Sequence, residues 1–208
     1  PARHAILGPL IRSIFVPEKN CDWGIFDYSQ QEPRLVVHYA SLQEFTGASK
    51  FLDAYEAEDT TDFHQLVADI ANIPRKQAKT INLGLFYGMG KGKLMSQLGL
   101  NQEDAEDLLA DYHDRVPFVR QLMKDTMYKA GKKGFLRTLR GRKCRFDMWE
   151  PKTFGVHKAL PLKEAANEYG DQMIKRAWTY KALNRLIQGS AADQTKQAML
   201  NLYKEGYL

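Results

Sequence analysis

The sequence predicts an α+β fold in which helix is in large excess over strand. Most of the 208 residues show the apolar spacing typical of amphipathic helices, whereas runs rich in β-forming residues are few and short. The sequence contains neither internal repeats nor a low-complexity linker. Apolar residues make up 44% of the chain and charged residues 26%, which is the composition of an ordinary globular protein rather than a disordered one.

The first predicted element is a short buried strand. Residues 23–27 (WGIFD) form an apolar run rich in β formers that ends in an acid, Asp27. A carboxylate at the end of a buried strand costs free energy unless its charge is compensated, and a divalent metal ion is the usual compensation. Glu32 falls in the first turn of the next helix, where the helix dipole favours an anion. Taken alone, a capping acid followed by a helix-start carboxylate explains the pair better than a metal site does.

The helices that follow begin at capping residues, among them Asp62 and Asn101, or at prolines, and several end near glycine. Pro33 is tolerated because it falls in a first turn. A hairpin is predicted over residues 134–147 and a loop over residues 150–162, which carry two prolines. The predicted helices cover residues 31–45, 62–71, 74–88, 102–114 and 117–131, then a segment from about 163 with an interruption at 188–190, and finally 191–204.

The charge pattern favours a polyanionic partner without establishing one. The net charge is +5 and the pI is near 9.1. Residues 132–145 are rich in Lys and Arg and contain no acid, so we interpret them as a phosphate-contacting surface slightly in preference to a solvated hairpin. No run is long enough to cross a bilayer and no signal-peptide pattern is present, so we expect a cytoplasmic protein without membrane contact. Cys21 and Cys144 indicate neither a disulfide framework nor a zinc site.

A second pattern places four side chains on one side of a helix. Arg75, Lys79, Leu83 and Tyr87 recur every four residues, with two cations at the N-terminal end and an apolar–aromatic pair at the C-terminal end. A nucleoside triphosphate fits such a surface, because cations bind phosphates and a flat face binds the base and sugar. An amphipathic helix with an aromatic end explains Leu83 and Tyr87 equally well, but it leaves the two cations to chance.

Three segments together resemble the family A DNA polymerases, the family that includes bacterial DNA polymerase I. Residues 27–34 (DYSQQEPR) resemble the first conserved motif of this family. Residues 75–88 (RKQAKTINLGLFYG) resemble the second, on the fingers helix that closes over the incoming nucleotide. Residues 184–193 (NRLIQGSAAD) are similar to a signature near the primer terminus. The segments appear in family order, and the resemblance extends over nearly the whole chain with features of phage-encoded members.

The resemblance implies an enzyme that adds a dNTP to a primer 3′-OH, with primer–template DNA and dNTP as partners. Asp27 would bind both catalytic Mg²⁺ ions, with the backbone carbonyl of Tyr28 as a second ligand. Arg75 and Lys79, joined by His64 from the preceding helix, would neutralise the triphosphate. Without the resemblance, His64 is expected to be a surface residue of its helix. Lys79 would also protonate the pyrophosphate leaving group.

Further positions would select the sugar and hold the DNA. Glu32 would block a ribose 2′-OH, and Tyr87 would stack near the templating pair. Gln30 is placed with the nucleotide-binding residues. Leu83 stands where the family usually carries Phe or Tyr, so sugar discrimination and fidelity are the properties that this departure affects. The residues expected to contact primer–template DNA through the minor groove are Asn184 and Gln188, with Lys181 nearby.

The resemblance also divides the chain among the parts of a right-hand polymerase. Residues 1–40 would be a palm segment with the first metal-binding motif, residues 41–175 the fingers, and residues 176–208 a palm helix region. The family's third motif, a hairpin with a His-Asp-Glu run that supplies the second metal-binding carboxylate, is expected after this region, together with a thumb supplied in cis or in trans. His113-Asp114 is not this motif, because it lies in an acid-rich helical stretch. We therefore expect the chain by itself to be inactive.

Two other functions stay open. A single-subunit RNA polymerase shares the metal-binding Asp and a similar fingers helix, but Glu32 argues against it because that position must be small to admit ribose. A non-catalytic module that binds DNA or dNTP and needs a second chain for turnover is the alternative from another class. The glycine-rich residues 88–94 (GMGKGKL) do not form a phosphate loop, because the glycine spacing is short and Leu94 stands where Ser or Thr would hold Mg²⁺.

Overall fold

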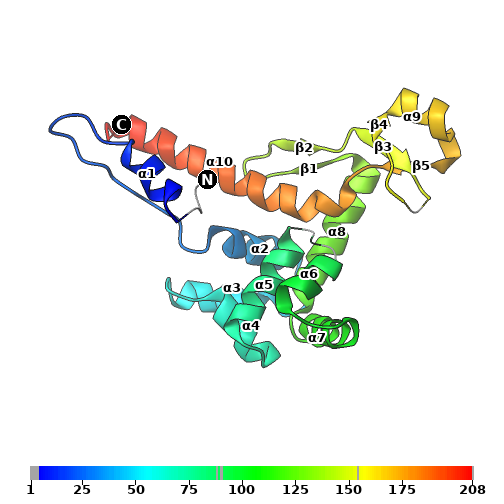
Figure 1. Cartoon of the computed structure of the whole chain (residues 1–208), viewed down its shortest axis with the longest axis horizontal. Coiled ribbons are helices and arrows are strands. Elements are labelled where there is room, and N and C mark those ends of the chain that lie inside the picture. The colour runs from blue at the N-terminus through cyan, green and yellow to red at the C-terminus, as the bar shows by residue number, and fades with distance from the viewer. Residues whose placement is uncertain (1–4, 88, 90, 154, 208) are drawn as a thin grey trace.

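The computed structural model describes residues 5–87, 89, 91–153 and 155–207 (Figure 1). Helices dominate this part of the chain, and the strands are short. The helices are α1 (Leu7–Ser13), α2 (Gln31–Ser41), α3 (Ala48–Ala57), α4 (Phe63–Ala71), α5 (Arg75–Phe86), α6 (Lys91–Leu98), α7 (Gln102–Arg115), α8 (Pro117–Lys133), α9 (Leu162–Tyr169) and α10 (Ala182–Lys204), with 3₁₀ turns η1 (Asp171–Met173) and η2 (Thr179–Lys181). The strands are β1 (Phe135–Arg137), β2 (Lys143–Arg145), β3 (Met148–Pro151), β4 (Leu160–Pro161) and β5 (Ile174–Arg176).

Helices α2 to α8 pack around one apolar core, which the N-terminal half of α10 helps to close (Figure 1). The ring of Phe63 lies at its centre, with ring centroids 5.2 Å from Phe51, 6.0 Å from Phe86 and 6.4 Å from Phe118. Burying a side chain of this size stabilises the fold by about 1.5–3 kcal/mol. Packing of this core therefore holds the site-bearing helices in place more than their intrinsic helix propensity does.

Most predicted helix starts are confirmed because their signals are local. Asp62 caps α4, and its carboxylate accepts hydrogen bonds from two backbone N–H groups of the first turn. Asn101 caps α7 through one such bond, from the backbone N–H of Asp104, and Pro117 is the first residue of α8. Helix α8 continues past Gly131, because Gly134, at φ +75°, adopts the left-handed conformation that ends it.

The predicted interruption at residues 188–190 is wrong, because α10 runs unbroken through them. A Cβ atom on Gly189 would lie 2.9 Å from Cγ2 of Thr138 and 3.3 Å from Sγ of Cys144. The glycine is therefore required by the close approach of the β1–β2 hairpin, which lies along α10 (Figure 1), and not by a break in the helix.

The hairpin over residues 134–147 is confirmed, with β1 and β2 antiparallel and Leu136 opposite Cys144. The segment predicted as loop and helix beyond it differs from expectation, because β3 pairs with both β4 and β5. The guanidinium of Arg176 lies 4.6 Å from the ring centroid of Trp149 and donates a 2.8 Å hydrogen bond to the carbonyl of Phe146. These contacts between distant residues favour an extended β5 over the helix that local propensity predicts.

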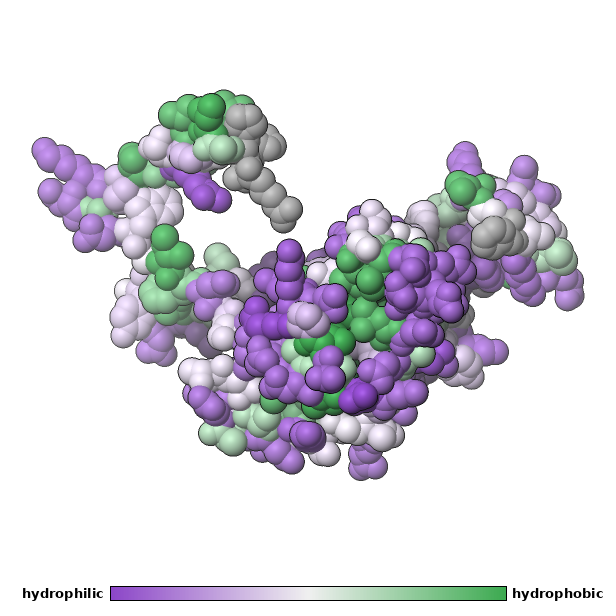
Figure 2. All heavy atoms as spheres, turned by 60° about the horizontal axis from the view of Figure 1, so that its bottom comes forward, coloured by the Kyte–Doolittle hydropathy of each residue, from purple (hydrophilic) through white to green (hydrophobic). Residues whose placement is uncertain are grey.

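The predicted strand over residues 23–27 is absent from the described structure, where this segment is extended and exposed. Ile25 and Phe26 are both 89% exposed. A strand needs a neighbour for its backbone hydrogen bonds, and no described segment pairs with this one. Figure 2 shows that the N-terminal part of the molecule, at the upper left, also carries exposed apolar side chains. Leu10 of α1 is 58% exposed, and Ile14, directly after this helix, is 72% exposed. No helix in the described ranges has the length and apolarity that a membrane span requires.

Candidate nucleotide-binding site

Helix α5 presents its predicted site residues on one side. It begins directly after Pro74, which fixes the entry of the chain into the helix. Arg75, Lys79 and Tyr87 are exposed and Leu83 is half-buried. The opposite side is sealed in the core by Ala78, Ile81 and Phe86. The four-residue spacing thus gives a solvent-facing row with cations at one end and an aromatic ring at the other.

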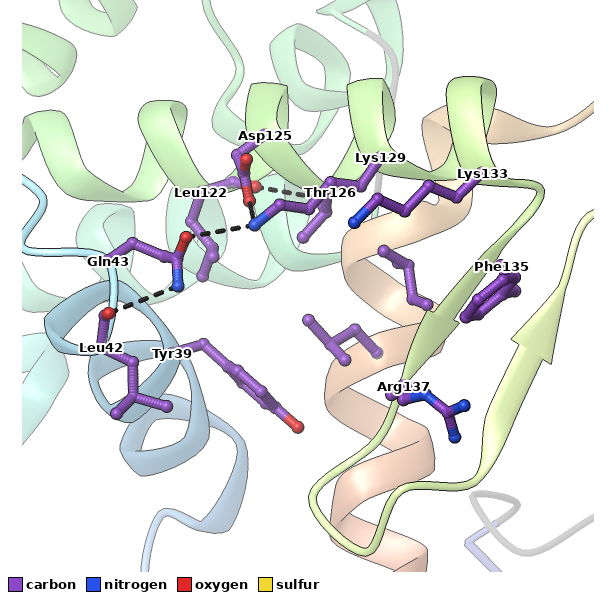
Figure 3. A pocket seen from close by; sticks show the side chains of 12 residues that line it. Tyr39, Leu42, Gln43, Leu122, Asp125, Thr126, Lys129, Lys133, Phe135 and Arg137 are labelled. Carbon is purple, nitrogen blue, oxygen red and sulfur yellow. Dashed lines mark hydrogen bonds and ion pairs between the residues drawn. The ribbon is translucent and has the colours of Figure 1, made fainter.

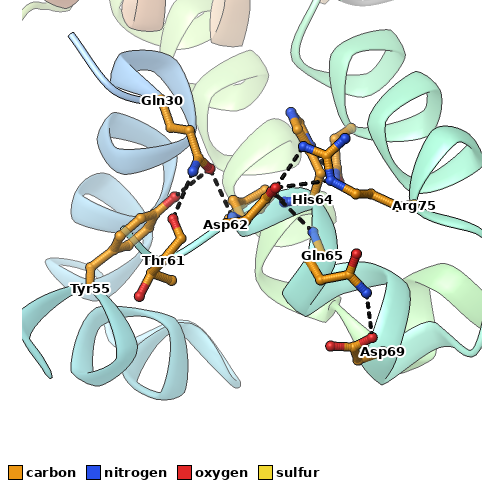
Figure 4. Close-up of polar contacts among 10 residues, drawn as sticks. Gln30, Tyr55, Thr61, Asp62, His64, Gln65, Asp69 and Arg75 are labelled. Atoms are coloured by element: carbon orange, nitrogen blue, oxygen red, sulfur yellow. Dashed lines mark hydrogen bonds and ion pairs between the residues drawn. The ribbon is translucent and has the colours of Figure 1, made fainter. Parts of the chain in front are cut away.

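The cation that starts this row, Arg75, is paired with an acid. Its Nε and Nη2 atoms donate to Oδ2 of Asp62 at 2.9 and 2.6 Å (Figure 4). The other carboxylate oxygen of Asp62 accepts from the backbone N–H groups of His64 and Gln65 at 2.9 and 3.2 Å. Burial by itself would raise the pKa of Asp62, but these hydrogen bonds and the Arg75 charge outweigh burial and lower it. The capping pattern in the sequence identified Asp62, but not its second partner.

His64 is a buried residue, only 7% exposed, and not the surface position that its sequence context indicates. Its Nδ1 atom lies 3.0 Å from the amide nitrogen of Asn82, and the hydroxyl of Tyr112 donates to the amide oxygen of Asn82 at 2.5 Å. Burial lowers the pKa of His64, and the charges of Lys79 and Arg75 lower it further while Asp62 opposes them. A neutral His64 can donate a hydrogen bond to a phosphate, but it adds no positive charge.

Asn82 and Tyr112 were not identified as site residues from the sequence. Both are fully buried. A usable signal for Asn82 does exist, because asparagine is unfavourable inside a helix and its presence on the buried side of α5 requires a polar partner. No comparable signal marks Tyr112, which lies on α7 far along the chain.

The three motif segments meet at the C-terminal end of α5. The hydroxyl of Tyr87 donates a 2.6 Å hydrogen bond to Oε2 of Glu32 on α2. Burial, this hydrogen bond and the Glu32 charge raise the pKa of Tyr87 to about 12, while a hydrogen bond with the Gln188 side chain on α10 acts in the opposite direction. Sequence spacing alone could not show that these three side chains lie together.

Gln30 is engaged within the protein rather than open to a ligand. Its amide nitrogen donates to the carbonyl of Thr61 at 2.7 Å, and its amide oxygen accepts from the backbone of Phe63 at 2.8 Å and from the hydroxyl of Tyr55 at 3.4 Å (Figure 4). The residue sits in the left-handed conformation directly before α2. These contacts tie the start of α2 to the start of α4, and so hold the first motif beside the α4–α5 pair.

Asp27 and Tyr28 lie in the exposed segment before α2. With Thr195 and Asn201 of α10 they line a cleft of about 510 Å³. In the described part of the chain, no three His, Cys, Asp or Glu side chains come close enough together to hold a metal ion. A carboxylate and a backbone carbonyl are ligands that a hard divalent cation accepts, so Asp27 and Tyr28 fit part of such a site but do not form the whole of it.

The residues predicted to contact DNA start α10. Lys181 ends η2, and Asn184 and Gln188 follow on one side of the helix because they are four residues apart. Lys181 and Gln188 are exposed, and Asn184 is half-buried. The three residues thus follow one another along the start of α10, and the last of them, Gln188, hydrogen-bonds the Tyr87 side chain.

The basic residues 132–145 cover the end of α8 and the β1–β2 hairpin. Beside them, a cleft of about 440 Å³ lies between α2, α8, β1 and α10 (Figure 3). Lys133, Phe135 and Arg137 line one side of it. Lys129, in contrast, is held by Asp125 at 2.7 Å and by Gln43 at 3.1 Å. Lys133 and Arg137 therefore leave this surface basic, and phosphate contact there stays a prediction.

Comparison with known proteins agrees with this architecture. The sequence model of DNA polymerase family A matches residues 2–207. A DNA-directed DNA polymerase of Pseudomonas phage M6 is 36% identical over 94% of this chain and 32% of its own length. DNA polymerase I of Geobacillus stearothermophilus is 32% identical over 94% of this chain and 20% of its own length. The chain thus spans a third or less of these relatives.

A solved structure shares the fold. The POL domain of Pol1 from M. smegmatis, determined in complex with DNA primer-template and dNTP, superposes with a TM-score of 0.62 at 30% identity, covering 86% of this chain and 29% of that one. The predicted fold class, α+β with helix in excess, is confirmed as part of a polymerase fold. Since the family model covers nearly every residue and the fold agrees independently, the chain belongs to DNA polymerase family A.

Proposed function

We propose that this chain is the nucleotide-binding part of a DNA-directed DNA polymerase, which extends a primer 3′-OH with a dNTP. The observation that carries the proposal is the exposed row on α5, with cations followed by an apolar–aromatic pair, in a chain of this family. The M. smegmatis relative, solved with primer-template and dNTP, supports it. In this assignment residues 1–40 and 176–208 are palm and residues 41–175 are fingers.

We assign phosphate binding to Arg75, Lys79 and His64. Lys79 is exposed on α5 and would bind the phosphates as a point charge, and its ammonium would then donate a proton to the departing pyrophosphate and become a neutral amine. Arg75 uses two of its five N–H donors on Asp62, so the remaining donors can reach a phosphate while the pair stays intact. The pairing also fixes the guanidinium at the N-terminal end of α5.

Residues at the C-terminal end of α5 would select the sugar and the base. Glu32 is held by the Tyr87 hydroxyl and so keeps one orientation at the junction of α2 and α5. We assign Glu32 to exclude a ribose 2′-OH, Leu83 to pack on the sugar and Tyr87 to stack beside the templating pair. Gln30 acts indirectly, because its amide holds α2 against α4.

The metal proposed here is Mg²⁺, and only part of its site is supplied by the described residues. Asp27 and the carbonyl of Tyr28 would hold it, and the remaining ligands would come from other segments of the polymerase. When bound, the metal stabilises charge on the phosphoryl group during transfer. Asp27 contributes by bringing a carboxylate to the cleft beside α10.

The proposed partners are primer–template DNA and the remaining polymerase segments, with Lys181, Asn184 and Gln188 on the DNA. The relatives come from phages and bacteria, so the proposed place of action is the cytoplasm of a bacterium or a phage-infected cell.

A titration with a fluorescent dATP analogue and Mg²⁺ tests the proposal. Lys79→Ala should weaken binding by roughly 10- to 100-fold, because a hydrogen bond to a charged group contributes about 1.5–3 kcal/mol. Lys76→Ala is the matched control, since Lys76 is exposed on α5 but lies off the row. Equal losses in the two variants would show that α5 attracts nucleotides by general charge and that the row is no specific site.

A further inference from the structure

Three buried or nearly buried polar side chains form a chain of hydrogen bonds behind the α5 row. The Tyr112 hydroxyl on α7 donates to Oδ1 of Asn82 on α5, and Nδ2 of Asn82 faces Nδ1 of His64 on α4 at 3.0 Å. Tyr112 and Asn82 are fully buried, and His64 is 7% exposed. Each of these residues comes from a different helix, so helix packing fixes their relative positions.

The donor and acceptor chemistry of the three groups determines which ring nitrogen of His64 carries the proton. The amide oxygen of Asn82 can only accept and the amide nitrogen can only donate. The buried Tyr112 hydroxyl has no other acceptor among the described residues, so it donates to this oxygen and the amide nitrogen is left facing His64. Nδ1 of His64 must then accept, which requires that it carry no proton. A neutral imidazole has one N–H, and this proton is therefore on Nε2. An imidazolium would set two donors against each other across the 3.0 Å contact.

We propose that Asn82 and Tyr112 are positioning residues that fix His64 as the neutral Nε2–H tautomer, with this N–H presented to a phosphate of the bound nucleotide. The phosphate part of this inference rests on the proposed function, whereas the tautomer does not. Among the described residues Nε2 has no hydrogen-bond partner, and His64 keeps an exposed fraction of 7%. The positive charges of Lys79 and Arg75 act on the His64 ring, so this donor lies near the cations that would hold the phosphates.

The electrostatic surroundings support the same protonation state. Burial lowers the pKa of His64 first, and the positive charges of Lys79 and Arg75 on α5 act in the same direction. The negative charge of Asp62, directly before α4, acts against them and favours the imidazolium. These effects favour the neutral imidazole, the same state that the contact of Nδ1 with the Asn82 amide requires.

Nitrogen-15 NMR of the histidine rings tests the tautomer without any need for activity. The chain has five histidines, and the His64 signals are assigned by their loss in His64→Gln. The wild-type chain should show one protonated and one unprotonated nitrogen for His64 near neutral pH, with the proton on Nε2. A proton on Nδ1, or on both nitrogens, would overturn the proposal.

Two variants separate the contributions of the positioning residues. Asn82→Asp replaces the amide donor with an acceptor, so the proton should move to Nδ1 and the pKa of His64 should rise. Tyr112→Phe frees the amide of Asn82 to rotate, so both tautomers should appear. A His64 spectrum in Tyr112→Phe identical to that of the wild type would remove Tyr112 from the proposal. If Asn82→Asp fails to fold, the wild-type spectrum still decides the tautomer.

Addition of dATP with Mg²⁺ then tests the phosphate contact. The Nε2–H resonance of His64 should shift on binding. An unshifted resonance with the Nε2–H tautomer intact would count against the nucleotide site on α5 and leave the hydrogen-bond chain standing. The failure of the proposed function and the failure of the tautomer are thus seen as different results.

Discussion

Replacing Gly189 by Ala should destabilise the protein although alanine is the better helix former. In the middle of α10 the substitution gains about 1 kcal/mol of helix propensity. The new Cβ would lie 2.9 Å from Cγ2 of Thr138, 3.2 Å from Nη2 of Arg142 and 3.3 Å from Sγ of Cys144. Overpacking of this kind costs about 1–3 kcal/mol, so the expected net loss is about 1 kcal/mol.

Two of the crowded neighbours, Thr138 and Arg142, cannot move away without losing hydrogen bonds. The Thr138 hydroxyl donates to the buried carboxylate of Asp193, and Arg142 donates to Asp193 at 2.8 Å and to the carbonyl of Gly189 itself at 2.9 Å. Asp193 is only 8% exposed, so weakening these bonds would leave a poorly solvated charge.

Gly131→Ala provides the matched control. Gly131 lies in the last turn of α8 with nothing within 4 Å of an added Cβ beyond its own helix backbone, so alanine there should stabilise the protein by about 0.5–1 kcal/mol. Urea unfolding followed by far-UV circular dichroism compares the midpoints at a common slope. A Gly189→Ala protein at least as stable as the wild type would refute the close-approach explanation. An equal loss of stability in Gly131→Ala and Gly189→Ala would refute it as well.

Two further predictions concern the polar contacts of the site. Asp62→Asn keeps an N-cap oxygen and loses only the half-exposed pair with Arg75, a loss of about 0–1 kcal/mol, whereas Asp62→Ala also loses the cap and about 0.5–2 kcal/mol more. The pKa of Asp62 is lowered in the folded protein, so its carboxylate stabilises the fold above the unfolded pKa of about 4, and this stabilisation is lost as the pH falls through the folded pKa. In urea unfolding series at acid pH, the stability of Asp62→Asn should therefore depend less on pH than that of the wild type. Glu32→Gln removes a negative charge beside Tyr87 and should lower the pKa of Tyr87 from about 12, as carbon-13 NMR of labelled tyrosines can measure with Tyr87→Phe for assignment. An unchanged Tyr87 titration would show that Glu32 does not contact it in solution.

The sequence predicts well what adjacent residues determine. Asp62 and Asn101 were recognisable as caps because the residues that they cap follow directly in the chain. The spacing of Arg75 and Tyr87 likewise predicted one exposed row, because helix geometry alone fixes which side chains share a side.

Features that depend on distant partners were missed or predicted wrongly. Residues 23–27 have the composition of a strand, but no described segment pairs with them. Gly189 resembles a helix breaker unless the hairpin that packs on it is known. His64 has the sequence context of a surface residue but is buried, where Asn82 of α5 hydrogen-bonds it and is itself held by Tyr112 of α7. In each case, the deciding contact joins residues that are far apart in the chain.

The central claim is that the exposed row of α5 binds a dNTP, and photoaffinity labelling tests it most directly. The chain is illuminated with 8-azido-dATP and Mg²⁺, digested with trypsin and mapped by mass spectrometry. Label is predicted on residues 80–91, the tryptic peptide that carries Leu83 and Tyr87, and an excess of dATP should suppress it. Label confined to the basic residues 132–145, or label that dATP does not displace, would contradict the claim.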